Sequence, residues 1–263
     1  MTRVRIGVQI HPQHGDMAGI NRAARQAEEM GADIVYVWDH FYPLYGNPDG
    51  AHFECWTILA AWAAMTSRVE IGALVTCNSY RNPQLLADMA RTIDHISQGR
   101  LIFGIGSGWF RRDYDEYGYT FGTAGSRLDD LAHSLPLITS RWEKLNPPPT
   151  RKLPMLIAGT GHRKTLPLVA RYADSWHAAF PDDPSELVPT VARLKECCAD
   201  VGRDPADIEW GLGLETGKLD ATVDEYLDMG FTQFTLGING PEFDLSHIPG
   251  WITWRDSLNA KSG

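Results

Sequence analysis

The sequence predicts a (β/α)8 TIM barrel, an α/β fold class, and three observations favour it. The chain has 263 residues, and an α/β barrel of about 250 residues folds as one unit. Short apolar segments alternate with amphipathic segments along the whole chain, which is the order of strands and helices in a parallel sheet. Several short segments are apolar on both faces, as parallel strands buried on each side are. We therefore expect a single barrel domain over residues 1–263.

Eight segments have the composition of strands, because each is rich in apolar or β-branched residues and is bounded by Gly, Pro, Asp or Asn. They are Val4–Ile10, Ile34–Trp38, Val69–Val75, Leu101–Ile105, Met155–Ala158, Asp174–His177, Ile208–Leu214 and Gln233–Ile238. Eight strands in this length leave about 33 residues per repeat, the size of a βα unit. An open doubly wound sheet competes with the barrel, but its glycine motif is missing after the first strand, where His11–Gly15 stand instead.

Apolar residues at helical spacing join these strands. Asn82 and Pro83 are the signals that begin a helix, and Gly99 is the signal that ends it. Ser126 is expected to cap a second helix. The same helical pattern extends over Met17–Met30, Phe53–Thr66 and Leu187–Val201.

Composition and charge exclude several classes of protein. Lys and Arg number 24 against 33 Asp and Glu, a net charge of -9, so we expect no nucleic-acid partner. The longest apolar stretch, Ile58–Met65, is far shorter than the roughly 20 residues of a membrane span, and Met1–Arg5 does not resemble the start of a signal peptide. The four cysteines form no Cys-x-x-Cys motif, so we expect reduced thiols and a cytoplasmic protein.

In a TIM barrel the loops that follow the strands carry the function. Asp39 and His40 follow the second strand, and a histidine there can act as acid or base with a carboxylate to orient it. The alternative is that both residues only cap the end of the strand. His11 and His177 also follow strands, but three or four convergent metal ligands cannot be assembled, and we expect no metal. Glu215–Gly217 is the corresponding loop after the seventh strand.

Two glycine-containing loops follow the fourth and fifth strands. The alternate glycines of Gly104–Trp109 let the backbone approach a ligand, although a tight turn explains them equally well. The chain from there to Gly125 is rich in aromatic residues that form either a pocket wall or a separate packing cluster. Ala158–Thr165 places glycines at the start of a helix, where free N–H groups favour a phosphate. Barrels bind phosphate more often after strands seven and eight, so this position is unusual.

Four blocks of sequence combine these features over most of residues 1–180. They are Trp38–Phe41, Ile71–Pro83, Asp94–Trp109 and Ile157–Asp174. With these blocks the chain resembles the luciferase-like monooxygenase superfamily, and within it the actinobacterial branch that uses the deazaflavin coenzyme F420 instead of FMN. The resemblance implies a bent coenzyme across the barrel mouth, resting on a bulge with a non-prolyl cis peptide between Leu74 and Val75.

The resemblance also implies roles for individual residues. His40 is expected to exchange a proton with the substrate, and Asp39 to fix its environment and to bind the coenzyme ring. The other residues expected to bind the coenzyme, F420 or alternatively FMN, are Leu74, Val75, Thr76, Gly106, Ser107, Gly108, Gly159, Thr160, Gly161 and His177. The substrate pocket is expected to include His11, Trp109 and Phe110.

The activity implied is hydride transfer between F420 and a small or medium organic substrate, by a homodimer with a flavin or F420 reductase as functional partner. Two alternatives stay open: an FMN-dependent two-component monooxygenase supplied by a separate flavin reductase, and a catalytically silent flavin-binding barrel. Trp109 stands where sugar-phosphate dehydrogenases of the family have a carboxylate, which disfavours a sugar phosphate. The connection from Trp142 to Pro154 is short, so it lacks the insertion that shelters an oxygenase site from water.

Overall fold

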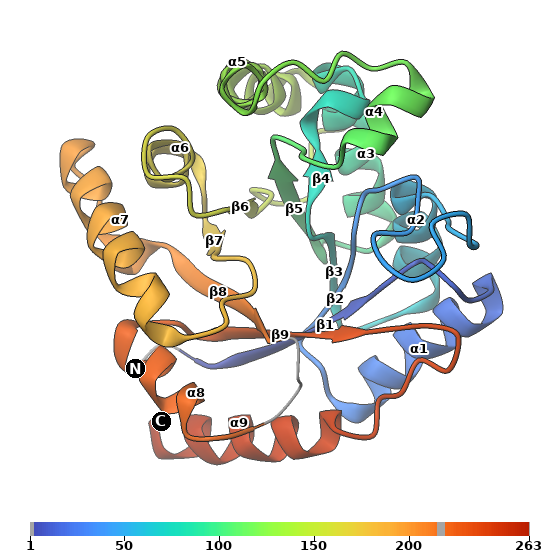
Figure 1. Ribbon diagram of the computed structural model, residues 1–263, viewed down its shortest axis with the longest axis vertical. Coiled ribbons are helices and arrows are strands. Elements are labelled where there is room, and N and C mark those ends of the chain that lie inside the picture. Colours follow the sequence, from blue (N-terminus) through green and yellow to red (C-terminus); the bar gives the residue numbers. More distant parts are fainter. Residues whose placement is uncertain (1–2, 215–218, 263) are drawn as a thin grey trace.

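A closed barrel of parallel strands forms the centre of the molecule (Figure 1). The computed structural model describes residues 3–214 and 219–262, so the predicted loop Glu215–Gly217 lies outside the described residues. The strands are β1 (Arg5–Ile10), β2 (Ile34–Val37), β3 (Glu70–Ala73), β4 (Thr76–Cys77), β5 (Leu101–Gly106), β6 (Met155–Ala158), β7 (Ser175–His177), β8 (Glu209–Leu214) and β9 (Gln233–Ile238). β1 pairs with β2 and β9, and β3 pairs with β5, which closes the sheet. The predicted (β/α)8 barrel is confirmed.

The third predicted strand is divided, and this is the main difference from the expected sheet. β3 and β4 both pair in parallel with β5, but the chain between them, Leu74 and Val75, leaves the ladder. The peptide bond between these two residues is cis, at the position that the family resemblance implies. The break turns this part of the backbone toward the barrel mouth, where both residues line a cavity.

Helices surround the strands (Figure 1). They are α1 (Met17–Met30), α2 (Cys55–Met65), α3 (Pro83–Ile96), α4 (Arg111–Tyr117), α5 (Ala124–Lys144), α6 (Thr165–Tyr172), α7 (Val188–Asp200), α8 (Thr222–Met229) and α9 (Ile248–Ser262), with short 3-10 turns at Asn78–Tyr80, Pro184–Leu187 and Pro205–Asp207. In the part of the chain that the structure describes, no helix is long and apolar enough to cross a membrane.

The helix signals read from the sequence were right in one case and shifted in another. The Asn82 side chain accepts hydrogen bonds from the N–H groups of Gln84 and Leu85, so Asn82 caps α3 as predicted. The predicted cap at Ser126 is wrong, because α5 begins three residues earlier, with Thr123 as its cap. Thr123 accepts from the N–H of Ser126, and the Ser126 hydroxyl accepts from the N–H of Thr123, a reciprocal pair that satisfies both donors.

The two ends of the barrel differ in how they are filled. At the end where the strands begin, Arg5 forms ion pairs with Glu70 and with Glu209. Apolar side chains fill the interior above these ion pairs, and the cluster is Ile34, Tyr36, Leu74, Ile102 and Leu156. This packing leaves the opposite end, where the strands finish, as the place for a binding site.

Candidate active site

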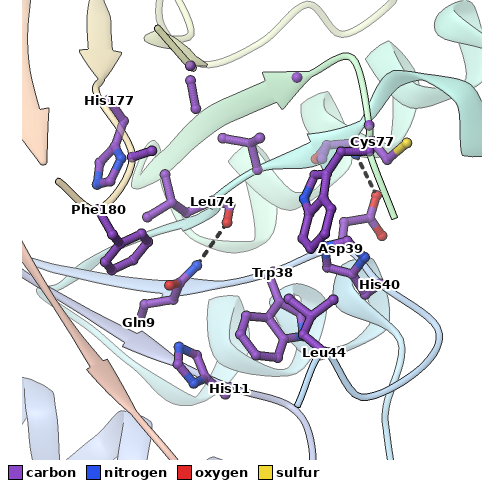
Figure 2. A pocket seen from close by; sticks show the side chains of 18 of the residues that line it. Gln9, His11, Trp38, Asp39, His40, Leu44, Leu74, Cys77, His177 and Phe180 are labelled. Carbon is purple, nitrogen blue, oxygen red and sulfur yellow. Dashed lines mark hydrogen bonds between the residues drawn. The ribbon is translucent and has the colours of Figure 1, made fainter. Parts of the chain in front are cut away.

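A cavity of about 810 Å³ lies where the strands end, and Figure 2 shows side chains that line it. Most of the predicted site residues line this cavity, namely His11, Asp39, His40, Leu74, Val75, Thr76, Gly106, Ser107, Gly108, Trp109, Gly159 and His177. Thr160, Gly161 and Phe110 are not among its lining residues. Its volume is in the range of small-molecule and cofactor sites.

His40 is held by a carboxylate from another element. Its Nδ1 donates to Oδ2 of Asp113 over 2.7 Å, and the Asp113 side chain is fully buried. Asp113 lies in α4, a helix that the aromatic-rich segment was not predicted to contain. Among the described residues, no group hydrogen-bonds to Nε2 of His40. The imidazole is thus oriented from one side and has its second nitrogen available to a ligand.

Asp113 is itself fixed by three further hydrogen bonds. Its Oδ1 accepts from the backbone N–H groups of Phe41 and Tyr42 at 3.1 and 3.2 Å. The Tyr80 hydroxyl donates to Oδ2 over 2.8 Å. A buried carboxylate is costly unless its lone pairs are satisfied, and here four donors satisfy them. Asp113 therefore ties the loop after β2 to α4 and to the 3-10 turn at Asn78–Tyr80.

Asp39 does not orient His40, which corrects that part of the prediction. Its carboxylate accepts two hydrogen bonds from Arg81, at 2.6 and 3.0 Å, and one from the N–H of Cys77 at 3.0 Å. Figure 2 shows the bond to Cys77. Burial alone lowers the pKa of Arg81, but the charge of Asp39 and its hydrogen bonds raise that pKa above its ordinary value. Asp39 is the acceptor that holds β4 and the following turn against β2.

The backbone at the strand break is supported from inside the barrel. Nε2 of Gln9, on β1, donates to the Leu74 carbonyl over 2.8 Å (Figure 2). Next to the break, the Oγ1 atom of Thr76 is buried and has no hydrogen-bond partner among the described residues. A buried polar atom without a partner on the wall of a cavity points to a ligand group that completes it.

His177 provides a second such atom on the other side of the cavity. Its side chain ends β7, and its Nε2 is buried without a hydrogen-bond partner among the described residues. Burial lowers the pKa of His177 to about 3, so the ring is neutral near pH 7. Thr76 and His177 therefore present uncharged polar groups, which fit a planar, polar ring system such as a flavin or deazaflavin.

Aromatic rings surround the predicted substrate side. His11 stacks on Trp38 with ring centroids 4.1 Å apart. Its Nδ1 lies 2.6 Å from Oδ1 of Asn239, and the Tyr45 hydroxyl contacts both groups. Burial lowers the pKa of His11 to about 4, although the bond to Asn239 partly offsets this effect. His11 is thus a neutral, hydrogen-bonded wall of the cavity.

Trp109 and Phe110 flank His40. Their ring centroids lie 5.7 and 5.5 Å from that of His40, in edge-to-face arrangements. The preceding turn requires glycine at 108, where φ is 77° and a β-carbon would collide with the side chains of Tyr114 and Cys77. The turn therefore serves packing, as the tight-turn alternative expected, and it also lines the cavity.

The predicted phosphate loop lies beside the cavity rather than inside it. Gly159 lines the cavity, and α6 begins at Thr165. No backbone N–H of residues 160–164 donates a hydrogen bond to another described residue. Free N–H groups before a helix attract an anion. The loop thus retains the features on which the phosphate prediction rests.

Three residues that shape the site were not predicted from the sequence. Asp113 lies in a stretch expected to be an aromatic loop, and no local pattern separates it from its acidic neighbours. Arg81 lies within a block that supports the family resemblance, but its pairing with Asp39 needs a contact across 42 residues. Gln9 is a polar residue between the apolar residues Val8 and Ile10 of the first strand, and this was the one available signal. In the described part of the chain, no group of three or more His, Cys, Asp or Glu side chains could hold a metal ion.

The fold and this cavity define a barrel with a cofactor-sized site at the strand ends, and comparison with known proteins shows its family. The model of the luciferase-like monooxygenase family matches residues 1–217, so the chain belongs to that family. A phthiodiolone/phenolphthiodiolone dimycocerosates ketoreductase of Mycobacterium tuberculosis is 28% identical over 250 residues. That match covers 81% of this chain and 65% of the relative, so this chain spans less than two thirds of the relative's length.

Two solved structures share the fold at low sequence identity. An F420-dependent secondary alcohol dehydrogenase, in complex with an F420-acetone adduct, has a TM-score of 0.80 and 18% identity, covering 90% of this chain and 93% of that one. The oxygenating constituent of 3,6-diketocamphane monooxygenase of Pseudomonas putida, in complex with FMN, has a TM-score of 0.65 and 17% identity, covering 81% and 67%. Proteins that share this fold thus include one bound to a deazaflavin and one bound to a flavin.

Proposed function

We propose that the protein is an F420-dependent oxidoreductase that interconverts a carbonyl group and a carbinol on a small or medium organic substrate. The observation that carries the proposal is His40, whose Nδ1 is bound to the buried Asp113 and whose Nε2 is left to the cavity. A hydride transfer to or from a carbon–oxygen bond needs one proton at the oxygen, and we assign the holding and release of that proton to Nε2 of His40.

Asp113 orients the imidazole of His40, and His40 transfers the proton. Asp113 accepts the Nδ1 proton of His40 and so leaves Nε2 of the neutral ring as the acceptor. In the direction of alcohol oxidation Nε2 takes the hydroxyl proton, and in the direction of ketone reduction the protonated ring returns it. A bound deazaflavin supplies the site of hydride exchange, because its reactive position is a carbon.

We propose that the coenzyme is held by the predicted residues that line the cavity. The unpartnered Oγ1 of Thr76 and Nε2 of His177 hydrogen-bond to its ring, and the ring packs on Leu74 and Val75. The free N–H groups of residues 160–164 bind its phosphate. The names of the F420-dependent alcohol dehydrogenase and of the mycobacterial ketoreductase support both the coenzyme and the carbonyl chemistry.

The proposal has further parts that concern the whole chain. We propose that residues 1–263 act as one domain, that the protein is a cytoplasmic homodimer, and that a reductase regenerates its coenzyme.

An FMN-dependent monooxygenase is the second candidate, favoured by the structural neighbour that holds FMN. A silent barrel is disfavoured, because binding alone gives no reason for the His40–Asp113 pair.

A coenzyme titration tests the proposal first. The apo protein is titrated with F420 and with FMN, and quenching of its nine tryptophans reports binding. We expect micromolar binding of F420 and at least tenfold weaker binding of FMN, a gap of about 1.4 kcal/mol. Tighter FMN binding would transfer the protein to the oxygenase branch, and binding of neither would remove the coenzyme assignment.

A His40→Ala variant then tests the acid–base role. We expect turnover to fall by roughly 10²- to 10⁴-fold, the range that acid–base groups contribute. The Kd of the coenzyme should stay unchanged, because other residues hold it. His133→Ala is the matched control, since His133 is exposed on α5 away from the cavity. Full turnover in His40→Ala with normal coenzyme binding would remove the role.

A further inference from the structure

We propose that the substrate of this site is an uncharged ketone, or the matching secondary alcohol, whose carbon substituents are apolar. The inference rests on the proposed function for the redox reaction. The substrate class itself is argued from the charged and aromatic side chains of the cavity. Three independent observations support it.

The first observation is the charge of the cavity wall. Among the described residues that line it, Asp39 is the one Asp, Glu, Lys or Arg, and its carboxylate is already paired with Arg81. Two of the three lining histidines, His11 and His177, are neutral near pH 7, because burial lowers their pKa values to about 4 and about 3. Asp39 and Arg81 neutralise each other, so a carboxylate or phosphate on the substrate would meet no unpaired Lys or Arg among these lining residues, and its burial there is unfavourable.

The second observation is the surroundings of His40. The ring centroids of Trp38, Trp109 and Phe110 lie 6.1, 5.7 and 5.5 Å from that of His40. Of these rings, Trp38 and Trp109 line the cavity, so a substrate oxygen that hydrogen-bonds to Nε2 of His40 places its carbon substituents near them. Aromatic and alkyl groups gain from burial against such surfaces, whereas polar groups there would lose their hydrogen bonds to water.

The third observation is the cavity mouth. Three lining aromatics remain exposed, with 62% of Trp109, 46% of Tyr45 and 37% of Phe180 accessible to solvent. They come from the segments after β5, β2 and β7, so they approach the cavity from different sides. Exposed aromatics gathered at the edge of one cavity are typical of a site that takes up apolar ligands.

The reaction balances with the coenzyme as the redox partner. On reduction, the carbonyl carbon gains a hydride and the π electron pair becomes an O–H bond with the proton held at Nε2 of His40. The ketone thus gains two protons and two electrons. The reduced deazaflavin loses the same, as one hydride and one proton that passes to solvent, and it ends oxidised.

A matched pair of ketones tests the substrate class. 4-Methylacetophenone and 4-acetylbenzoate have nearly the same shape and differ by one negative charge. Binding of each to the protein is measured by calorimetry and tryptophan quenching, with and without F420, and consumption of reduced F420 is followed in parallel. We expect the neutral ketone to bind at least tenfold more tightly and to be the one reduced. Equal or tighter binding of 4-acetylbenzoate would overturn the proposal.

Variants tie the result to the cavity wall. Trp109→Ala should weaken binding of 4-methylacetophenone by about tenfold, in line with the loss of one aromatic contact surface. Leu85→Ala should change nothing, because Leu85 is an equally exposed apolar residue on α3 that does not line the cavity. An unchanged Kd in Trp109→Ala would contradict this placement of the ketone.

The outcomes also separate the two proposals. If F420 does not bind but the neutral ketone is preferred, the proposed coenzyme falls and the apolar substrate class stands. If F420 binds and neither ketone binds, the substrate class falls while the coenzyme assignment stands.

Discussion

Asp113 and His40 are separated by 73 residues in the sequence, and their hydrogen bond joins the loop after β2 to helix α4. The carboxylate is fully buried and accepts from four donors, so its position is determined by the backbone of the β2 loop as well as by His40. Since only one imidazole nitrogen contacts it, Asp113 also selects the tautomer of the neutral ring. It is a positioning residue that acts through His40.

Asp113→Asn should lower kcat by roughly tenfold to a thousandfold, less than removal of the acid–base group itself. The amide can still accept from Phe41 and Tyr42, but its NH2 group then faces Nδ1 of His40 and the Tyr80 hydroxyl. The ring is expected to adopt the other tautomer, with the proton on Nε2. Steady-state kinetics should show the loss in kcat with little change in KM or in coenzyme Kd.

Asp115→Asn is the control for this variant, because Asp115 lies on the same helix, is exposed and pairs with Arg111. It should behave as the parent protein. If Asp113→Asn raised KM and left kcat unchanged, that result would contradict the positioning role.

Sequence reasoning at the residue scale predicted His40, which lines the cavity, but it paired His40 with Asp39, whereas the carboxylate bonded to it is that of Asp113. Asp39 adjoins His40 in the chain, so proximity favoured it, yet its side chain binds Arg81 and Cys77. Neighbouring residues at a strand end point in different directions, whereas a residue many positions away can complete the site. Such pairings depend on tertiary contacts that spacing along the sequence does not carry.

At the scale of elements, the cavity floor depends on how closely β5 approaches the break between β3 and β4. Gly104 lies in β5, and a β-carbon there would collide with the carbonyl oxygen of Ala73. Because the obstacle is backbone, no change of rotamer relieves it. Gln9 holds the next carbonyl, that of Leu74, so the backbone here has little freedom to shift.

Gly104→Ala should therefore lower the free energy of unfolding by more than about 3 kcal/mol, as overpacking against fixed backbone does. Urea unfolding followed by circular dichroism measures it. Gly250→Ala is the matched control, since a β-carbon at that position in α9 meets nothing. The control should be neutral or more stable by up to about 1 kcal/mol. Parent-like stability of Gly104→Ala would show that β5 can move.

The elements themselves were largely predictable. All eight predicted strands exist, because runs of buried apolar residues bounded by Gly, Pro and Asp are a strong local signal. The break at Leu74 and Val75 leaves no trace in apolar patterning, and only the family resemblance indicated it. Helix α4 was missed because its seven residues, Arg111–Tyr117, are mostly charged and show no apolar stripe.

At the scale of the whole molecule, the two ends of the barrel differ in their ionisable groups. Ion pairs around Arg5 fill the end where the strands begin, while the opposite end holds three histidines with depressed pKa values. Burial is the leading cause for His11, His52 and His177 alike. A site built from neutral histidines suits uncharged ligands, and it also makes the stability of the folded protein depend on pH.

The sign of that dependence follows from proton uptake by the unfolded chain. His177 has a pKa of about 3 when folded and an ordinary value of 6.5, so below pH 6.5 the unfolded state binds a proton that the folded state does not. The free energy of unfolding therefore falls as the pH decreases from about 6.5 toward 3. By about pH 5, this one residue should cost about 2 kcal/mol.

His177→Asn removes this titration and keeps a neutral polar side chain in the cavity. The loss of unfolding free energy between about pH 7.5 and about pH 5 should thus be smaller by about 2 kcal/mol in the variant than in the parent. Urea unfolding of the parent and of the variant at both pH values gives the four free energies of unfolding that are compared. His133→Asn, on the exposed face of α5, should keep the dependence of the parent. If His177→Asn also keeps the pH dependence of the parent, the pKa of His177 is not lowered in the folded protein, and the inference of an uncharged substrate would lose one of its two neutral histidines.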